Sequence, residues 1–246
     1  MVLKRYKLEV LNDLLEYNNL KIYQDTEMFS FSLDSVLLPN FVTLNKSIKK
    51  ILDIGSGNAV IPLILSTKTD ALITGIEIQK ESYNLGKKSI ELNKLEDRIN
   101  FINADVKEYA KNIESDTFDT ITCNPPYFKI TNESRTNNSD FKTIARHELY
   151  LNLDDLFSIA KKLLKNNGNI AIVHRPERLV EIIEVMKKNN IEPKIIQLIY
   201  PGLKKNANIL LIEGVKNGKP GLKVLKPIYS HLENGEYTDE IKKYFK

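Results

Sequence analysis

Short apolar segments alternate with amphipathic segments from about residue 50 onward, and this alternation is the strongest constraint on the fold. Five segments have the length and apolar content of strands: 51–54, 71–78, 99–104, 118–123 and 169–174. Four have the spacing of helices: 59–66, 80–94, 153–166 and 177–188. This order is typical of βαβ units that build a parallel sheet. Two closing strands, 195–200 and 208–215, have no helix between them and are predicted to pair antiparallel.

The helix predicted at 153–166 has recognisable ends. Asp154 and Asp155 lie in its first turn, where carboxylates interact favourably with the positive end of the helix dipole. Gly168 follows its last residues, and glycine commonly ends helices because it adopts left-handed backbone angles at no steric cost. We therefore expect Gly168 to terminate the helix before strand 169–174 begins.

The composition is that of a globular protein. The chain has 246 residues, 42% of them hydrophobic, and a formal net charge of +4, which agrees with a polyanionic partner. It lacks an apolar stretch long enough to span a membrane, and its start lacks the apolar core of a secretory signal. The single cysteine, Cys123, excludes an internal disulfide and lies in a strand pattern as a small core residue. We therefore expect a cytoplasmic protein.

Two regions lie outside the alternating pattern. Residues 1–48 are expected to form an N-terminal extension, with a loop and short helix around 29–38, that contributes to the site of the main domain at 49–246. The polar segment 128–150 is long for a loop in a compact domain. Such loops are usually functional or disordered, so this one is a candidate substrate clamp.

A glycine turn joins the first predicted strand to the first predicted helix, in Asp53-Ile54-Gly55-Ser56-Gly57-Asn58. The first glycine permits a tight turn, and the second lets the backbone approach a ligand closely. Glu77 follows Gly57 by about twenty residues, where a carboxylate can bind ribose hydroxyls. Val60 stands where a dinucleotide fingerprint has its third glycine. An adenosine ligand without phosphates, such as S-adenosylmethionine, therefore fits this turn better than a dinucleotide.

Two more carboxylates lie at strand ends near this turn. Asp105 ends the third predicted strand, where it either accepts from the adenine amino group of the ligand or caps the helix that starts at Lys107. Asp53 is expected nearer to the methionine part of the ligand, where it orients the turn or pairs with the ligand's ammonium group.

The tetrapeptide Asn124-Pro125-Pro126-Tyr127 ends the fourth predicted strand. The proline pair makes a stiff corner and removes two N–H donors. The Asn124 side-chain oxygen and the first proline carbonyl can accept both hydrogens of a planar amino group, and Tyr127 offers a flat face for the ring that carries it. The pattern indicates that a planar amine is held while a methyl group is passed to it.

Several other polar residues have more than one interpretation. His147, in the 128–150 loop, fits a base, a phosphate contact or a surface residue. Arg175 and Arg178 follow the fifth predicted strand and either contact phosphate or solvate a helix start. The three histidines are scattered without metal-ligand spacing, so no metal site is expected.

These features resemble the class I S-adenosylmethionine-dependent methyltransferases, specifically the amino-group methylases that carry N-P-P-Y, and within them the bacterial tRNA(Val) adenine-N6 methyltransferases. The resemblance covers nearly the whole chain and includes the segments 29–35, 53–58, 75–79, 123–128, 145–148 and 174–178. It implies a Rossmann-like α/β fold: a seven-stranded, mostly parallel sheet with an antiparallel last strand and helices on both faces. It also implies a monomer that uses S-adenosylmethionine, needs no metal and methylates N6 of adenine 37 in tRNA.

The resemblance also implies a set of site residues. Catalysis is assigned to Asn124, Pro125, Pro126 and Tyr127. The cofactor site comprises Asp34, Asp53, Gly55, Gly57, Asn58, Glu77, Ile78, Asp105, Val106 and Asn124. Substrate contacts are expected from Phe128, Arg135, Arg146, His147, Arg175 and Arg178.

The same tetrapeptide also serves enzymes that methylate other planar amines. A protein glutamine-amide N5-methyltransferase and an rRNA N-methyltransferase are therefore alternatives, and a non-catalytic RNA-binding module that keeps the cofactor fold is another. Arg135, Arg146 and Arg175 favour RNA over protein, and intact Asn124 and Glu77 argue against a non-catalytic module.

Overall fold

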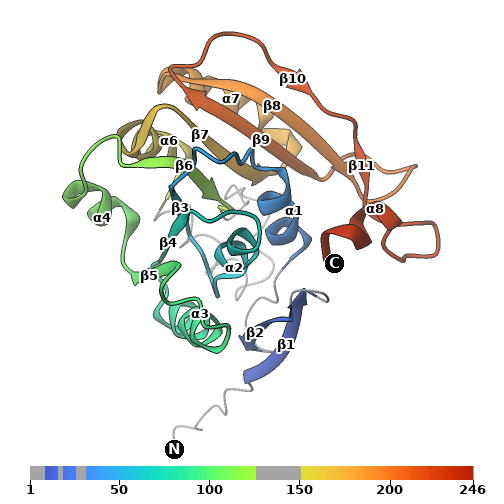
Figure 1. Cartoon of the computed structure of the whole chain (residues 1–246). Coiled ribbons are helices and arrows are strands. Elements are labelled where there is room, and N and C mark those ends of the chain that lie inside the picture. The colour runs from blue at the N-terminus through green and yellow to red at the C-terminus, as the bar shows by residue number, and fades with distance from the viewer. Residues whose placement is uncertain (1–8, 16–18, 26–31, 126–150, 246) are drawn as a thin grey trace, which may run out of the picture.

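The computed structural model of the chain describes residues 9–15, 19–25, 32–125 and 151–245 (Figure 1). Several predicted site residues lie outside the described residues: Pro126, Tyr127, Phe128, Arg135, Arg146 and His147. The whole polar segment 128–150 lies outside them as well.

Seven strands form the main part of a central sheet. In spatial order they are β5 (Ile99–Asn103), β4 (Leu72–Glu77), β3 (Lys50–Ile54), β6 (Phe118–Cys123), β7 (Leu164–His174), β9 (Ile209–Lys216) and β8 (Ile191–Tyr200). The pairs from β5 to β7 are parallel, and β9 runs antiparallel to both of its neighbours. The predicted mostly parallel sheet with an antiparallel last strand is confirmed.

Two short strands, which were not predicted, extend this sheet to nine strands. β10 (Lys223–Val224) and β11 (Ile228–Tyr229) both pair in parallel with β8. Because β8 runs in the same direction as β7 and β6, the carboxyl end of β11 lies at the same edge of the sheet as the carboxyl ends of the central strands.

Helices cover both faces of the sheet (Figure 1). One apolar cluster takes side chains from α1 (Leu33–Phe41), α2 (Val60–Ser66), α3 (Lys80–Leu92) and α8 (Asp239–Lys242), and the short helix η3 (Lys243–Phe245) packs against it. The other takes them from α4 (Val106–Asn112), α6 (Leu153–Leu163) and α7 (Leu179–Lys188). Strand β3 supplies both clusters because its side chains alternate: Ile51 joins the first, Leu52 and Ile54 the second.

The expectation that Gly168 ends a helix is wrong. Helix α6 ends at Leu163, and the buried Leu164 already belongs to β7, where it pairs with Phe118. Gly168 lies inside β7, where a Cβ would stand 2.9 Å from the carbonyl oxygens of Asp119 and Lys165. Close backbone approach, and not helix termination, explains this glycine.

Other element boundaries differ from the predictions by smaller amounts. The helix predicted at 177–188 begins as a 3-10 turn, η2 (Pro176–Arg178), and continues as α7. The predicted short helix in the N-terminal extension is α1. No helix in the described part of the chain has the length and apolar character needed to cross a membrane.

The N-terminal extension also contains a hairpin that the sequence did not predict. β1 (Glu9–Leu15) and β2 (Leu20–Asp25) pair antiparallel outside the central sheet (Figure 1). The hairpin packs on α3, where the Tyr23 backbone N–H donates to Ser89 Oγ at 2.9 Å and Lys88 pairs with Glu9. Leu14 and Ile22 are buried against the main domain.

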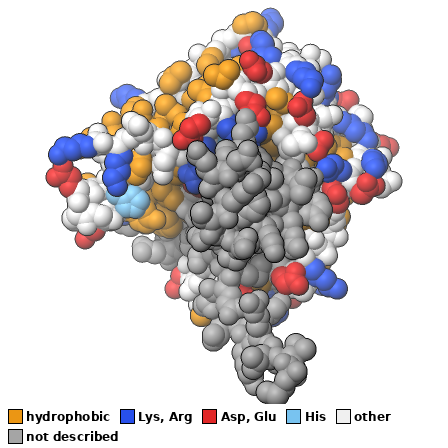
Figure 2. Space-filling model, turned by 180° about the vertical axis from the view of Figure 1, so that it is seen from behind, with side chains coloured by type: hydrophobic (Ala, Val, Ile, Leu, Met, Phe, Trp, Pro, Cys, Tyr) orange, Lys and Arg blue, Asp and Glu red, His pale blue; other side chains and the backbone are white. Residues whose placement is uncertain are grey.

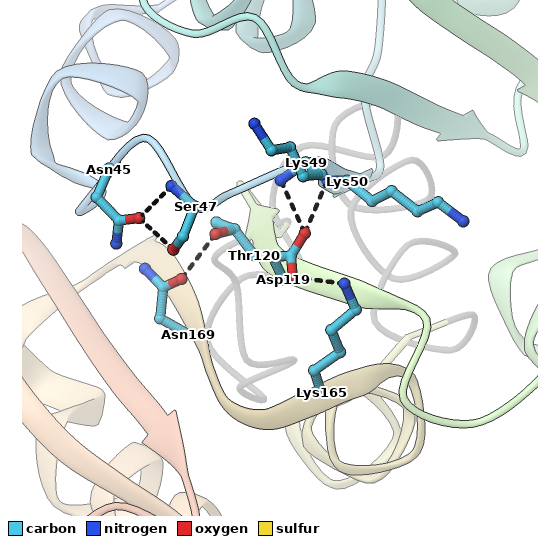
Figure 3. Close-up of polar contacts among 8 residues, drawn as sticks. All are labelled: Asn45, Ser47, Lys49, Lys50, Asp119, Thr120, Lys165 and Asn169. Carbon is cyan, nitrogen blue, oxygen red and sulfur yellow. Dashed lines mark hydrogen bonds and ion pairs between the residues drawn. The ribbon is translucent and has the colours of Figure 1, made fainter.

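A group of polar contacts ties the amino ends of the central strands together (Figure 3). Asp119 Oδ2 accepts from the backbone N–H groups of Lys49 and Lys50 at 2.8 and 2.9 Å, and its Oδ1 accepts from Lys165 Nζ at 2.7 Å. These contacts join the starts of β3, β6 and β7 at the edge opposite the glycine turn. The residues predicted to bind the ligand lie at the opposite, carboxyl edge of the sheet.

Candidate active site

Most of the predicted cofactor residues and Asn124 lie at the carboxyl edge of the sheet. Gly55 and Gly57 follow β3, Glu77 ends β4, Asp105 follows β5 and Asn124 follows β6. These four strands are adjacent and parallel, so their carboxyl ends lie side by side. Ligands bind at this edge in open α/β sheets.

The glycine turn has the left-handed backbone that its sequence predicts. Gly55 and Gly57 have φ angles of 70° and 57°, a region that residues with a Cβ rarely adopt. The N–H groups of Gly55 and Ser56 both donate to the Ile76 carbonyl, at 2.9 and 3.0 Å, which holds the turn against β4. The turn is therefore built by its own residues and by the neighbouring strand.

Glu77 braces this turn through its carboxylate. Its Oε2 accepts from the Gly57 N–H at 2.8 Å and its Oε1 accepts from the Gln79 N–H at 2.7 Å. Burial raises the pKa of Glu77, and these backbone hydrogen bonds act in the opposite direction. Glu77 therefore supports the glycine turn structurally, and the ribose contact predicted from its spacing stays a prediction.

Asp53 is fully buried below the turn. Its Oδ1 accepts from Thr122 Oγ1 at 2.6 Å, whereas no hydrogen-bond partner is found for the buried Oδ2 among the described residues. Burial raises the pKa of Asp53 to about 7, with a smaller contribution from the charge of Glu77. Thr122 is a supporting residue that the sequence analysis missed, although its place in the strand before Asn124 was visible.

Asp105 caps α4, which agrees with one of its two predicted interpretations. Its Oδ1 accepts from the Lys107 N–H at 2.7 Å. Val106, the first residue of α4, is buried, and Ile78, directly after β4, is exposed. The predicted cofactor contacts of these three residues stay predictions.

Asn124 lies against the N-terminal extension. Its Nδ2 donates to Ser35 Oγ at 3.2 Å, across 89 residues of sequence. Ser35 belongs to the first turn of α1, next to the buried Asp34. The extension thus reaches the predicted catalytic residue directly. Ser35 was not among the predicted site residues, although it lies in the 29–35 segment on which the resemblance rests.

A chain of polar contacts through the buried Glu213, Asn169 and Thr120 anchors the other end of α1. The Thr43 N–H donates to Glu213 Oε2 at 2.7 Å, and the Thr43 carbonyl accepts from Asn169 Nδ2 at 3.2 Å. Asn169 Oδ1 in turn accepts from Thr120 Oγ1 at 2.7 Å, as drawn in Figure 3. These contacts bind the end of α1 to β9, β7 and β6.

The hairpin contacts the cofactor turn from the other side. Asn58 Nδ2 donates to the Tyr23 carbonyl at 3.2 Å. The N-terminal extension therefore contacts both the glycine turn, through Tyr23, and the tetrapeptide, through Ser35.

The arginines after β7 already have protein partners. Arg178 donates to both carboxylate oxygens of Glu181, at 3.0 and 2.7 Å, and Arg175 Nη1 donates to the Asn208 carbonyl at 2.8 Å. His174 is buried beside them, and burial lowers its pKa to about 4. Pro125, His174 and Arg178 line one small cleft, which places β7 next to the tetrapeptide.

A family model described as a methyltransferase domain matches residues 45–218. The chain belongs to this family. The order and direction of the strands agree with a methyltransferase domain, so the predicted Rossmann-like fold is confirmed. Membership of this family also confirms S-adenosylmethionine as the cofactor.

This methyltransferase has curated relatives of nearly its own length. It is similar to the tRNA1(Val) (adenine(37)-N6)-methyltransferase of Parabacteroides distasonis, with 28% identity over 233 residues that cover 93% of this chain and 94% of that protein. A protein of the same name from Shewanella woodyi is 30% identical over 164 residues, which cover 65% of each.

Solved structures show the same fold at lower identity. A predicted O-methyltransferase from Agrobacterium tumefaciens aligns with a TM-score of 0.68 and 20% identity, covering 86% of this methyltransferase and 95% of that chain. TYW2 of P. horikoshii, in complex with MeSAdo, aligns with a TM-score of 0.56 and 16% identity, covering 84% and 73%. These structures support the architecture alone.

Proposed function

We propose that this methyltransferase transfers a methyl group from S-adenosylmethionine to the exocyclic N6 amino group of adenine 37 in tRNA(Val). The observation that carries the proposal is the position of Asn124: it follows β6, the strand that pairs in parallel with β3, whose carboxyl end leads into the glycine turn. The full-length relative from Parabacteroides distasonis carries this activity in its name.

The residues at the carboxyl edge fit S-adenosylmethionine. The orphaned, buried Asp53 Oδ2 suits a cationic partner, and the glycine turn offers backbone without a Cβ at two positions. Glu77 and Asp105 would hold the ribose and adenine, and Asp34, Asn58, Ile78 and Val106 would complete the pocket. When bound, the cofactor supplies an electrophilic methyl group.

Asn124 and Pro125 would prepare the target amine. The adenine N6 lone pair is delocalised into the ring, which makes it a poor nucleophile. Hydrogen bonds from its two N–H groups to the Asn124 side-chain oxygen and the Pro125 carbonyl favour a tetrahedral nitrogen with its lone pair directed at the methyl group. The methylated nitrogen is then acidic and releases one proton to water, so a strong base is unnecessary.

Ser35 would position the Asn124 amide for this task. An amide offers an oxygen that accepts and a nitrogen that donates, and Asn124 donates through its nitrogen to Ser35. In this hydrogen bond the amide nitrogen faces Ser35. We therefore assign Ser35, and with it the N-terminal extension, to the active site.

The target base must leave its stack to reach Asn124, because an exocyclic amine inside a stacked loop cannot be approached in line. Tyr127 and Phe128 would stack on the extruded base, and Arg135, Arg146, His147, Arg175 and Arg178 would contact the surrounding RNA. We further propose that the enzyme acts as a monomer in the cytoplasm, which fits a chain with one buried cysteine.

Methylation of defined RNA tests the proposal. The purified enzyme is incubated with methyl-labelled S-adenosylmethionine and an unmodified tRNA(Val) transcript, a transcript in which guanine replaces adenine 37, ribosomal RNA and a release-factor protein. We expect label only in the first, with N6-methyladenine identified by mass spectrometry. Label in the protein or ribosomal RNA would establish one of the alternative activities instead.

A further inference from the structure

We propose that a surface at the β8–β11 end of the sheet binds unpaired nucleotides of the substrate RNA. This platform comprises Tyr200, Leu203, Lys204, Lys205, Tyr229, His231, Leu232, Tyr237 and Phe245. The proposal rests on the proposed function for the identity of the RNA and adds a contact region apart from the target adenine.

The platform lies at the same edge of the sheet as Asn124. Tyr200 ends β8 and Tyr229 ends β11, and both strands run in the direction of β6 and β7. Four strand spacings separate β6 from β11, which at about 4.8 Å each is about 19 Å along this edge. An RNA stem is about that wide, so one RNA can reach both places.

Aromatic rings are concentrated at the platform. Tyr200 and Tyr229 have ring centroids 5.5 Å apart, and the Tyr237 ring lies 4.8 Å from His231 and 5.7 Å from Phe245. Tyr237 is 36% exposed, although aromatic side chains usually favour burial. The other four rings are half-buried. Unstacked bases bind flat, accessible ring faces, whatever the base sequence.

The turn that carries these rings is held in place by the protein. His231 and Tyr237 form an antiparallel bridge, and Thr238 Oγ1 donates to the Tyr229 carbonyl at 2.7 Å. The Ser230 N–H donates to the Tyr200 carbonyl at 2.8 Å. A preorganised ring costs little conformational entropy when a base stacks on it.

Apolar and basic side chains surround the rings. Leu203 and Leu232 are 74% and 49% exposed, and large apolar residues gathered at a surface indicate a binding site. The Lys204 side chain is 89% exposed, and Lys205 beside it is exposed as well. Figure 2, from behind, shows apolar side chains gathered around a histidine at one side of the molecule, with basic side chains next to them.

Acidic residues in the same turn decide which part of the RNA fits. Glu233 lies 3.5 Å from Lys204, and Glu236 lies 3.8 Å from Lys242. Carboxylates repel phosphates, so the platform is poorly suited to a duplex backbone. We therefore expect a single RNA strand to bind here, with its bases stacked on the rings and its phosphates near Lys204 and Lys205, away from the carboxylates.

Arg175 links the platform to the active site. It follows β7, next to the cleft that Pro125 lines, and donates to the carbonyl of Asn208 at the end of the linker that carries Lys204 and Lys205. The carboxyl edge is therefore continuous from the tetrapeptide to the platform across β7, β9 and β8.

Direct RNA binding with matched variants tests the platform. Affinity for the unmodified tRNA(Val) transcript is measured by fluorescence anisotropy without turnover, and KM for RNA and kcat are measured separately. Tyr237→Ala should weaken binding and raise KM about 5-fold or more, because stacking on one ring contributes that much or more, with kcat unchanged. Tyr237→Phe keeps the ring and should stay within about 2-fold.

The double variant Lys204→Ala/Lys205→Ala changes only exposed side chains, so it tests RNA binding even if Tyr237→Ala folds poorly. It should weaken RNA binding because it removes two positive charges next to the rings. The control is Lys223→Ala/Val224→Ala on β10, where both residues are exposed and pair with the middle of β8. S-adenosylmethionine affinity should stay constant in every variant.

Unchanged RNA affinity in Tyr237→Ala and in the lysine double variant would overturn the platform. An equal loss in the β10 control would also overturn it, as would a dimer in sedimentation that Tyr237→Ala dissociates, because the surface would then join two copies. These failures differ from failure of the proposed function, in which the unaltered enzyme would methylate no tRNA.

Discussion

At the scale of residues, Asn124 is expected to contribute to turnover more than to binding. Asn124→Ala removes one of two acceptors for the target amine and leaves the glycine turn intact. Because this contact strengthens as the nitrogen becomes tetrahedral, kcat should fall about 10²-fold while cofactor affinity stays unchanged. Single-turnover methylation and calorimetric cofactor titration measure the two effects. Near-normal turnover would mean that the tetrapeptide is only a structural corner.

Ser35 should act through Asn124. Ser35→Ala removes the acceptor of the Asn124 amide, and loss of a neutral hydrogen bond of about 0.5–1.5 kcal/mol predicts a kcat lower by about 2- to 10-fold. Ser35→Thr keeps the hydroxyl and should restore most activity. Ser66→Ala, which removes a hydroxyl bonded within α2, is the control. If Ser35→Ala and Ser66→Ala behave alike, Ser35 has no positioning role.

Asp53 should make stability depend on pH. Its pKa rises from 3.8 to about 7 on folding, so the folded protein binds this proton more tightly than the unfolded chain. The stabilising contribution of this proton is therefore fully present below about pH 4 and is lost as the pH rises to about 7, by about 4 kcal/mol at most. Asp53→Asn cannot titrate and should lack this component. Urea unfolding across that range measures it, and a pH-independent difference between the two proteins would contradict it.

At the scale of elements, the contact between α1 and the sheet connects the N-terminal extension to catalysis. Glu213, buried in β9, accepts from the Thr43 backbone just beyond α1. Ser35 lies in the first turn of the same helix. A change that weakens the anchor at the C-terminal end of α1 should therefore alter the position of Ser35 and, through it, of Asn124.

Glu213→Ala tests this connection. It leaves the Thr43 N–H without its acceptor and removes a buried carboxylate from β9, so the free energy of unfolding should fall by about 1–3 kcal/mol, and kcat should fall as well. Glu108→Ala is the control, because Glu108 pairs with Lys111 on the exposed face of α4 and its loss should cost less than about 0.5 kcal/mol. Chemical unfolding and single-turnover rates measure both effects. Full activity in a destabilised Glu213→Ala protein would separate α1 from catalysis.

At the scale of the whole molecule, RNA binding should be electrostatic in part. The net charge of +4 is modest, so a few lysines and arginines at the carboxyl edge must supply the phosphate contacts. The logarithm of the tRNA affinity should fall linearly with the logarithm of salt concentration, and removal of one phosphate contact, as in Arg175→Ala, should lower the slope by about one. Lys94→Ala, on the loop after α3, should leave the slope unchanged. Salt-independent affinity would count against an RNA substrate.

The sequence predicted the elements whose signals are local. Apolar periodicity predicted the strands and most helices. Gly55 and Gly57 predicted a turn with left-handed backbone angles, which the structure has. It failed at Gly168, because a glycine before a strand can end a helix or permit close backbone contact, and only the neighbouring β6 distinguishes the two. The β1–β2 hairpin was missed because its burial depends on α3, more than sixty residues away.

The sequence by itself determined the strand segments, the glycine turn and the tetrapeptide, since each depends on residues close together in the chain. The order of these motifs along the chain predicted the methyltransferase class. Tertiary structure alone decided that Ser35 contacts Asn124, that Glu213 anchors α1, and that rings from β8, β11 and the C-terminal turn meet at one edge. It also decided that Asp53 is buried with one oxygen that has no hydrogen-bond partner among the described residues. The contacts of Ser35 and Glu213 join residues 89 and 170 positions apart. Their geometry follows from strand order and direction, which no local pattern contains.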